Sequence, residues 1–483
     1  MKFYALGFGL CTTWLWLLFL QGPLLEQAAQ SWDLSCMQFF FLFLLSHSLM
    51  SFALSSHTAL RNKIFSAKPF ALAVFLLPLL SLFILEGPGY LPVLPHIFLF
   101  IPAIISILAG MIAAPLFISW MEKFGHLPLT EAAKALAYSL CLAAVLTIGS
   151  IFMPSPIGVI LVAICPVLSF FFWKKLSANE TFPTSSIIEL PLADFLTTRL
   201  IILVALLYIA GGSIFSAMTL EQDFPYLFYL SNSTYASGCL VAVFLIKKSA
   251  VLDLHNIFFP VLPLIGTGFL LFPLMRPGYT WIAFAVLQSG VAFLDMYTWL
   301  LFSSLSRLHK DSFAVCSLGL GIITFFICGG NALSFILSSW ISDISRLNMI
   351  CLIAGIACLL AINFFHTTPL FRKIPSLSLQ ETVPAIPATA KPDDKTVAAI
   401  PVATVEEIHD RYRIGGLAIY LTPREKQVLF LLARGYGYKA ITEKLIISNN
   451  TVKFHIRNIY TKFDVTNRHD LLEKLVAREK DSL

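Results

Sequence analysis

Residues 421–475, LTPREKQVLFLLARGYGYKAITEKLIISNNTVKFHIRNIYTKFDVTNRHDLLEKL, decide the fold of the C-terminal part of this chain. Thr422 is followed by a proline and, three residues on, by Glu425, the pattern of a capping box that starts a helix. A third helix is predicted from apolar residues at spacings of four, three and four, namely Val452, Ile456, Ile459 and Phe463. The stretch therefore predicts four short helices that contain a helix-turn-helix.

The outer face of that third helix carries Lys453, Phe454 and Arg457. Lys453 and Arg457 lie one turn apart, so both side chains are able to enter one major groove together. From residue 421 to residue 483, twelve Lys and Arg stand against seven Asp and Glu. This local basic surplus is what a module that binds double-stranded DNA requires.

The preceding part of the chain has the composition of a membrane protein. The 483 residues are 58% hydrophobic and only 12% charged, whereas soluble domains have about 25% charged residues. Apolar runs of roughly twenty residues, the length that crosses a bilayer, recur along residues 1–373. We predict twelve membrane-spanning helices, centred near Thr12, Leu45, Leu77, Leu108, Ala143, Ala163, Tyr208, Ala236, Leu264, Gln288, Thr324 and Ala357.

The loop charges predict the orientation of these spans. Basic residues such as Arg61, Lys123 and Lys174 gather in the loops that share one side with both termini, and the other loops hold only Arg276 and Arg346. The positive-inside rule then places both termini in the cytoplasm. We expect a multi-pass protein of the bacterial inner membrane, with the C-terminal module on the side where the DNA lies.

The organisation predicts three segments: a transmembrane sensor domain (1–373), a flexible Pro/Ala/Thr-rich linker (374–416) and a DNA-binding domain (417–483). The longest loop within the membrane part, Lys174–Thr198, divides the spans into six plus six. This layout resembles the major facilitator superfamily, which implies an all-α bundle of two six-helix halves around a central site. The Gly…Asp-Arg…Gly-Arg loop of that family is absent from His57–Lys68, which argues against active transport.

Polar residues inside the predicted spans are the candidates for binding a small molecule. Asp295 is the one acid deep in an apolar run, and Tyr297 and Trp299 beside it are candidates to stack on an organic ligand. The other candidates are Gln288, His47, Asn232 and Asn331. The alternative for each is a hydrogen bond between helices. The glycine pairs 211–212 and 329–330 predict either close helix packing or a hinge.

The C-terminal stretch resembles the LuxR-type helix-turn-helix family through the string LTPRE…VL…LA.G….K.I…L.IS..TVK.H…I..K followed by V.NR. The resemblance implies that the third helix is the recognition helix and that Lys453, Phe454 and Arg457 meet base edges. It implies phosphate contacts from Lys439, Ser448, Asn449, Asn450 and Thr451. It also implies a homodimer formed through the last helix.

We therefore expect a membrane-anchored one-component transcription regulator that senses an unknown small molecule through its transmembrane domain. Two alternatives remain open, a secondary transporter with a regulatory DNA-binding tail and a passive membrane anchor. The sequence has no spacing typical of a metal site, a phosphate loop or a catalytic triad. We expect neither enzymatic activity nor a metal or other cofactor.

Overall fold

The computed structural model contains two compact units, Met1–Thr382 and Val383–Leu483. In the first unit the described residues are 2–19, 36–65, 67–90, 100–177, 198–220, 227–248, 257–275, 279–307, 309, 311–340 and 344–366. In the second unit they are 413–414, 417–418, 421–433, 436–445, 449–463, 465, 468 and 470–471. The predicted linker lies outside the described residues, except at 413–414.

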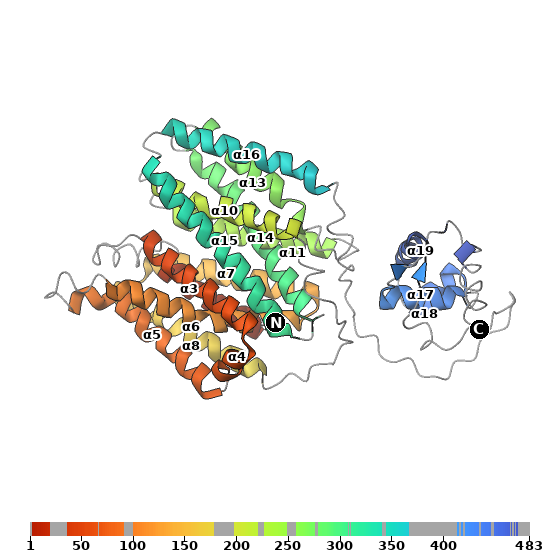
Figure 1. Ribbon diagram of the computed structural model, residues 1–483, viewed down its shortest axis with the longest axis horizontal. Coiled ribbons are helices and arrows are strands. Elements are labelled where there is room, and N and C mark those ends of the chain that lie inside the picture. Colours follow the sequence, from red (N-terminus) through yellow and green to blue (C-terminus); the bar gives the residue numbers. More distant parts are fainter. Residues whose placement is uncertain are drawn as a thin grey trace. The chain divides into compact units, whose positions relative to one another are not determined.

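The first unit is a bundle of helices that falls into two groups (Figure 1). The first group contains α1 (Lys2–Phe19), α3 (Cys36–Ser56), α5 (Ala67–Tyr90), α6 (Phe100–Gly125), α7 (Leu129–Gly149) and α8 (Ser155–Ser177), with the short α4 (Thr58–Ile64). The second contains α10 (Thr198–Leu220), α11 (Leu227–Lys248), α13 (Val261–Leu271), α14 (Thr280–Ser306), α15 (Ser312–Trp340) and α16 (Ile344–His366). Each of the twelve predicted centres lies in one of these helices, and each long helix holds one centre. The six-plus-six arrangement is therefore confirmed.

The length and apolar character of the helices suit a bilayer. Eight helices in the described part of the chain are long and apolar enough to cross a membrane. Large apolar side chains stand exposed on the outside of the bundle, among them Leu72, Phe75, Ile160, Leu206 and Phe244. Such a surface is unfavourable in water and matches lipid.

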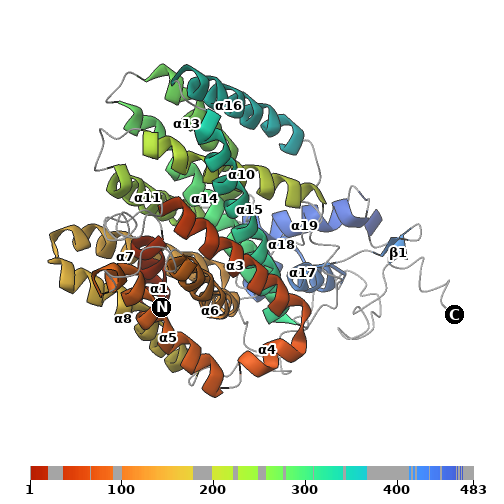
Figure 2. The ribbon, with the colours of Figure 1, turned by 60° about the vertical axis from the view of Figure 1, so that its left-hand side comes forward.

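The two groups, called here the N-terminal and C-terminal halves, meet mainly along three helix pairs. α3 packs on α15, α7 on α11 and α6 on α14, and Figure 2 shows α3 beside α15 from a second direction. Within the C-terminal half, Gly212 of α10 and Gly330 of α15 allow a very close approach. A Cβ added to Gly330 would lie 2.6 Å from the carbonyl oxygen of Ile209. Of the two expectations for the glycine pairs, close packing is therefore correct for Gly212 and Gly330.

The second unit is a small helical domain. Its helices are α17 (Pro423–Ala433), α18 (Tyr438–Leu445) and α19 (Asn449–Phe463). Their apolar faces form one core that includes Val428, Leu432, Ile441 and Ile459. Most of the predicted fourth helix lies outside the described residues, but Leu471 at its start is fully buried in this core.

Two short strands precede α17. β1 (Arg413–Ile414) pairs antiparallel with β2 (Leu417–Ala418), with Ile414 opposite Leu417. β1 falls in the segment that the sequence analysis assigned to the linker (374–416), and no strand was predicted there. The signal of the pairing was present, because two glycines between short apolar runs are typical of a tight hairpin.

Candidate nucleic-acid interface and candidate ligand site

Helix α19 presents a polar and a buried face. Lys453, Phe454 and Arg457 are exposed, and Phe454 has 40% of its surface accessible although it is aromatic. The opposite face, which includes Val452 and Ile459, is fully buried in the domain core. The helix is therefore held by its apolar side and offers two cations and one ring to a partner.

The start of α17 is fixed by the predicted capping box. The Glu425 amide donates to the Thr422 hydroxyl over 3.2 Å, and the Thr422 amide donates to the Glu425 carboxylate over 2.8 Å. The same carboxylate accepts a hydrogen bond from Lys462 near the end of α19. Glu425, which is only 2% exposed, therefore ties the start of the domain to the outward-facing helix.

Two arginines join helix ends within this domain. Arg424 donates to the Leu445 carbonyl at the end of α18 over 2.7 Å. Arg468 donates to the Leu432 carbonyl near the end of α17 over 2.8 Å. Both satisfy carbonyl groups that have no partner within their own helix, so these cations support the frame rather than the exposed face.

One histidine of α19 is sensitive to its surroundings. Burial lowers the pKa of the His455 imidazole, and the nearby Glu425 carboxylate opposes that shift. The imidazole is therefore held neutral beside the basic face of the helix, and it adds no cation to that face at neutral pH.

In the membrane unit, the Asp295 carboxylate lies between three helices of the C-terminal half. Tyr208 of α10 donates to one carboxylate oxygen over 2.7 Å, and Tyr235 of α11 donates to the other over 2.6 Å. Tyr208 also lies 2.6 Å from the Thr298 hydroxyl. We call Asp295, Tyr208, Tyr235 and Thr298 the Asp295 cluster.

Further polar groups lie near the contact between α11 and α14, called here the α11–α14 seam. Gln288, two turns before Asp295 on α14, donates to the Ser231 hydroxyl of α11. Asn232 is 8% exposed, and its buried amide nitrogen has no hydrogen-bond partner. Trp16 of the N-terminal half meets the Tyr235 ring edge to face, with centroids 5.7 Å apart. The seam therefore adjoins the boundary between the two halves.

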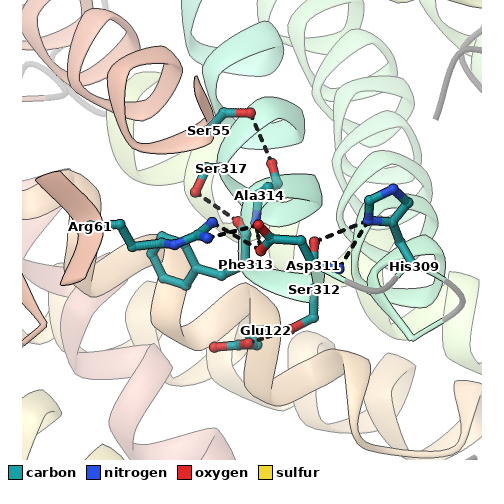
Figure 3. Close-up of polar contacts among 9 residues, drawn as sticks. All are labelled: Ser55, Arg61, Glu122, His309, Asp311, Ser312, Phe313, Ala314 and Ser317. Carbon is teal, nitrogen blue, oxygen red and sulfur yellow. Dashed lines mark hydrogen bonds and ion pairs between the residues drawn. The ribbon is translucent and has the colours of Figure 1, made fainter. Parts of the chain in front are cut away.

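A second polar site joins the halves at one end of the bundle (Figure 3). The Arg61 guanidinium of α4 donates to both carboxylate oxygens of Asp311, over 2.9 and 2.7 Å. Its carbon lies 5.6 Å from the centre of the Phe313 ring. Asp311 also caps α15, because the Ala314 amide donates to its carboxylate over 3.0 Å. We call this ion pair the Arg61–Asp311 clasp.

Neighbouring bonds strengthen the same junction. Ser312 donates to Glu122 of α6, and Ser55 of α3 donates to the Ala314 carbonyl over 3.1 Å. Arg307, after α14, donates to the carbonyl of Leu127 in the N-terminal half over 3.4 Å. These contacts hold the two halves together at the end of the bundle where α4 lies.

The C-terminal geometry agrees with comparisons to known proteins. Residues 420–475 match the family model "Bacterial regulatory proteins, luxR family". The C-terminal domain is a LuxR-type helix-turn-helix. The chain is 50% identical over 56 residues to the transcriptional activator protein CarR of Pectobacterium carotovorum, covering 11% of this chain and 23% of CarR. It is 45% identical over 59 residues to the oxygen regulatory protein NreC of Staphylococcus haemolyticus, covering 12% and 27%. The chain thus spans about a quarter of the length of these relatives.

The membrane unit is similar in fold to solved transporters. A bacterial homologue of the iron transporter ferroportin, in an outward-facing state, superposes with a TM-score of 0.54 at 11% identity over 76% of this chain and 99% of the other. The proton:xylose symporter XylE gives 0.53 at 11% identity, over 76% and 93%. At such identities the likeness concerns the fold alone, and it gives the membrane unit the major facilitator fold.

The predicted DNA contacts of the LuxR-type domain are placed in part. Lys453, Phe454 and Arg457 share the exposed face, and Thr451 lies in the first turn of α19, partly buried. Lys439 belongs to α18, and Asn449 and Asn450 begin α19, but their side chains are not among those that the structure describes. Ser448 lies outside the described residues. The DNA roles of all eight residues stay predictions.

The predicted ligand residues separate into two sets. Asp295 and Gln288 of α14 bond to residues of α11, and Asn232 is a buried residue of α11. His47 of α3 lies between the rings of Phe43 and Phe117, and Asn331 lies on α15; no contact among the described residues joins either to Asp295.

Sequence reasoning missed several contributors to these sites. It did not select Tyr208 or Tyr235, although a tyrosine within an apolar span is a signal of a buried hydrogen bond. Nearby, Tyr297 packs on Phe258 and Trp299 on Phe8, with centroids 4.9 and 4.8 Å apart. These two aromatic residues, expected to stack on a ligand, are thus occupied by contacts between helices.

Proposed function

We propose that this chain is a membrane-anchored one-component transcription regulator. Its LuxR-type domain binds operator DNA, and its major-facilitator-fold unit senses a small molecule. The observation that carries the proposal is the exposed face of α19, where Lys453, Phe454 and Arg457 stand free of the domain core. A LuxR-type domain in one chain with a membrane bundle couples a site in lipid to a site on DNA.

The proposed location is the bacterial inner membrane, with both termini in the cytoplasm. Support comes from the basic residues at one end of the bundle. The Lys175 ammonium at the end of α8 lies 4.5 Å from the centre of the Phe3 ring, so this loop and the N-terminus share one end. Arg61 and Lys63 of α4 belong to the next basic loop predicted on that side. Such a bias is typical of the cytoplasmic side.

On DNA, α19 enters the major groove as the recognition helix. Arg457 and Lys453 donate to base edges, and Phe454 offers an apolar contact to a thymine methyl group. Lys439, Ser448, Asn449, Asn450 and Thr451 contact phosphates and fix the register. Two copies paired through the last helix read a pseudo-palindrome with half-sites about one helical turn apart.

We assign sensing to the Asp295 cluster and the polar residues beside it. The response to the ligand is a change in the packing of the two halves against each other. The Arg61–Asp311 clasp joins the two halves at the end of the bundle where α4 lies, and it is the contact that such a change alters. Signal transfer proceeds by pairing of two chains, because pairing raises the effective concentration of one DNA-binding domain for the other.

The decisive experiment measures operator binding by the full-length chain in lipid nanodiscs, on sites first located by immunoprecipitation of bound chromosomal DNA. Replacing both Lys453 and Arg457 by Ala removes two contacts of about 1–3 kcal/mol each, so binding should weaken at least about 30-fold. Gln427→Ala, an exposed change on α17 that removes one hydrogen bond to Arg424 and leaves the bond of Arg424 to Leu445 in place, is the control and should bind normally. A folded double variant with an unchanged footprint would show that α19 is not the recognition helix.

A further inference from the structure

The structure assigns a class of ligand to the Asp295 cluster: we propose that it binds a small organic cation, an ammonium that also carries an oxygen acceptor. The inference rests on the proposed function, in which this cluster is the sensing site, and it names what is sensed.

The first support is the charge of the site. Asp295 is the only charged residue of the 27-residue helix α14. Its two oxygens receive hydrogen bonds from neutral phenols, and among the described residues no Lys, Arg or His forms an ion pair with it. A buried carboxylate without a counter-charge is unfavourable, and the negative charge is compensated either by a proton or by a bound cation.

The surroundings favour an organic cation over a metal ion. The described residues contain no group of three or more His, Cys, Asp or Glu that would hold a metal. A dedicated Ca²⁺ site supplies about six to eight oxygen ligands, and this cluster offers one carboxylate and three neutral hydroxyls. It does offer aromatic rings, since Trp16 and Tyr235 meet at 86° between their planes. Ring faces attract ammonium groups.

The second support is an unused donor on α11, the helix that carries Tyr235. The Asn232 amide nitrogen is buried without a partner, and Asn232 precedes Tyr235 by one turn of α11, about 4.5 Å along the helix axis. Buried amide donors are nearly always satisfied. An oxygen acceptor on the bound ligand would satisfy it. The site therefore fits an amino alcohol or a similar polar amine better than a plain alkylammonium.

The test uses the full-length chain in nanodiscs and three probes, ethanolamine, choline and benzylamine. Neutral twins that lack the charge are 3,3-dimethylbutan-1-ol for choline and benzyl alcohol for benzylamine. Thermal unfolding is followed at constant ionic strength, because a ligand that binds only the folded state raises the Tm. At least one cation should raise the Tm, ethanolamine or choline more than benzylamine, and neither neutral twin should do so.

Variants locate the effect. Asp295→Asn keeps the shape and should weaken cation binding at least tenfold. Tyr235→Phe, which removes one hydrogen bond, should weaken it by a smaller factor and serves if Asp295→Asn fails to fold. Glu131→Gln is the matched control, because Glu131 pairs with Lys134 within α7 and lies outside the cluster. It should bind as the unaltered chain does.

Four results would overturn the inference, three of which concern cation binding. Those three are no cation effect on the Tm, equal effects of a cation and its neutral twin, or unchanged cation binding by both cluster variants. A response to pH alone, independent of any cation, would make the occupant a proton and also overturn it. Operator binding is measured separately, so loss of the regulatory function and loss of the cation site are distinguishable outcomes.

Discussion

Neutralising Asp311 should shift the bundle toward a state in which its halves separate at the clasp. The side chains of Arg61 and Asp311 are 15% and 33% exposed, so water screens the pair only in part. Hydrogen bonds to charged groups contribute about 1.5–3 kcal/mol to stability. Because this bidentate pair is partly exposed, we expect a contribution of about 2 kcal/mol. Asp311→Asn should therefore lower the ratio of chains with the halves joined at the clasp to chains with the halves separated there roughly 30-fold.

Asn is the informative replacement because of the second role of Asp311. Its carboxylate accepts the Ala314 amide and caps α15, and Asn caps a helix about as well as Asp. The variant therefore removes the charge and keeps the helix end. Lys134→Gln is the matched control, since it breaks an ion pair with Glu131 inside α7 and leaves the boundary between the halves intact.

The assay is a distance distribution between spin-labelled residues at Thr58 in the N-terminal half and Ser304 in the C-terminal half, in nanodiscs. Asp311→Asn and Arg61→Gln should both add a longer distance. The exchange of the two charges, Arg61→Asp with Asp311→Arg, should restore only part of the short one, because an arginine at 311 cannot accept the Ala314 amide. The reasoning is refuted if both single variants keep the original distribution, or if Lys134→Gln changes it equally.

Three further changes test other parts of the structure. Gly330→Ala should destabilise the bundle by about 1–3 kcal/mol through overpacking, whereas Gly329→Ala, whose added carbon would lie 3.8 Å from Ile209, should not, as judged by Tm. Ile459→Ala, at a fully buried position of α19, should destabilise the LuxR-type domain by about 2–5 kcal/mol, measured by hydrogen exchange of α19 in the full chain; a change below 1 kcal/mol would contradict its place in the core. Because burial lowers the pKa of His455 in the folded domain, its contribution to stability is present above the unfolded pKa of about 6.5 and is lost as the pH falls through the lower, folded pKa. Exchange of α19 amides, corrected for intrinsic rates, should rise across that interval and do so less in His455→Gln.

The sequence predicted most of the architecture because the physics behind those predictions is local. A bilayer demands about twenty apolar residues per span, so the spans can be placed without knowing what packs on what. The capping box at Thr422 and Glu425 likewise depends on residues three apart, and both of its hydrogen bonds are present. The apolar spacing in α19 depends only on the helical period.

The partners inside the bundle could not be predicted in the same way. Arg61 and Asp311 are 250 positions apart, and Tyr208 and Asp295 are 87 apart. Such pairs depend on the rotation of each helix about its axis, and nearly uniform apolar spans carry little information about that rotation. Asp295 was selected because a lone acid in a span is conspicuous, while its tyrosine donors resemble the apolar residues around them.

Because Asp311 also caps α15, the population of open clasps and the rate at which the bundle rearranges depend on different parts of the structure. When the clasp opens, the Ala314 amide still holds the Asp311 carboxylate. Once the halves are back in contact, only the Arg61 side chain therefore has to be ordered for the pair to form again. Rotamer changes of accessible side chains take picoseconds to nanoseconds, and rigid-body motions of domains take microseconds to milliseconds. The ion pair therefore determines the equilibrium populations of the open and closed clasp. The packing of the two halves determines the rate at which they interconvert.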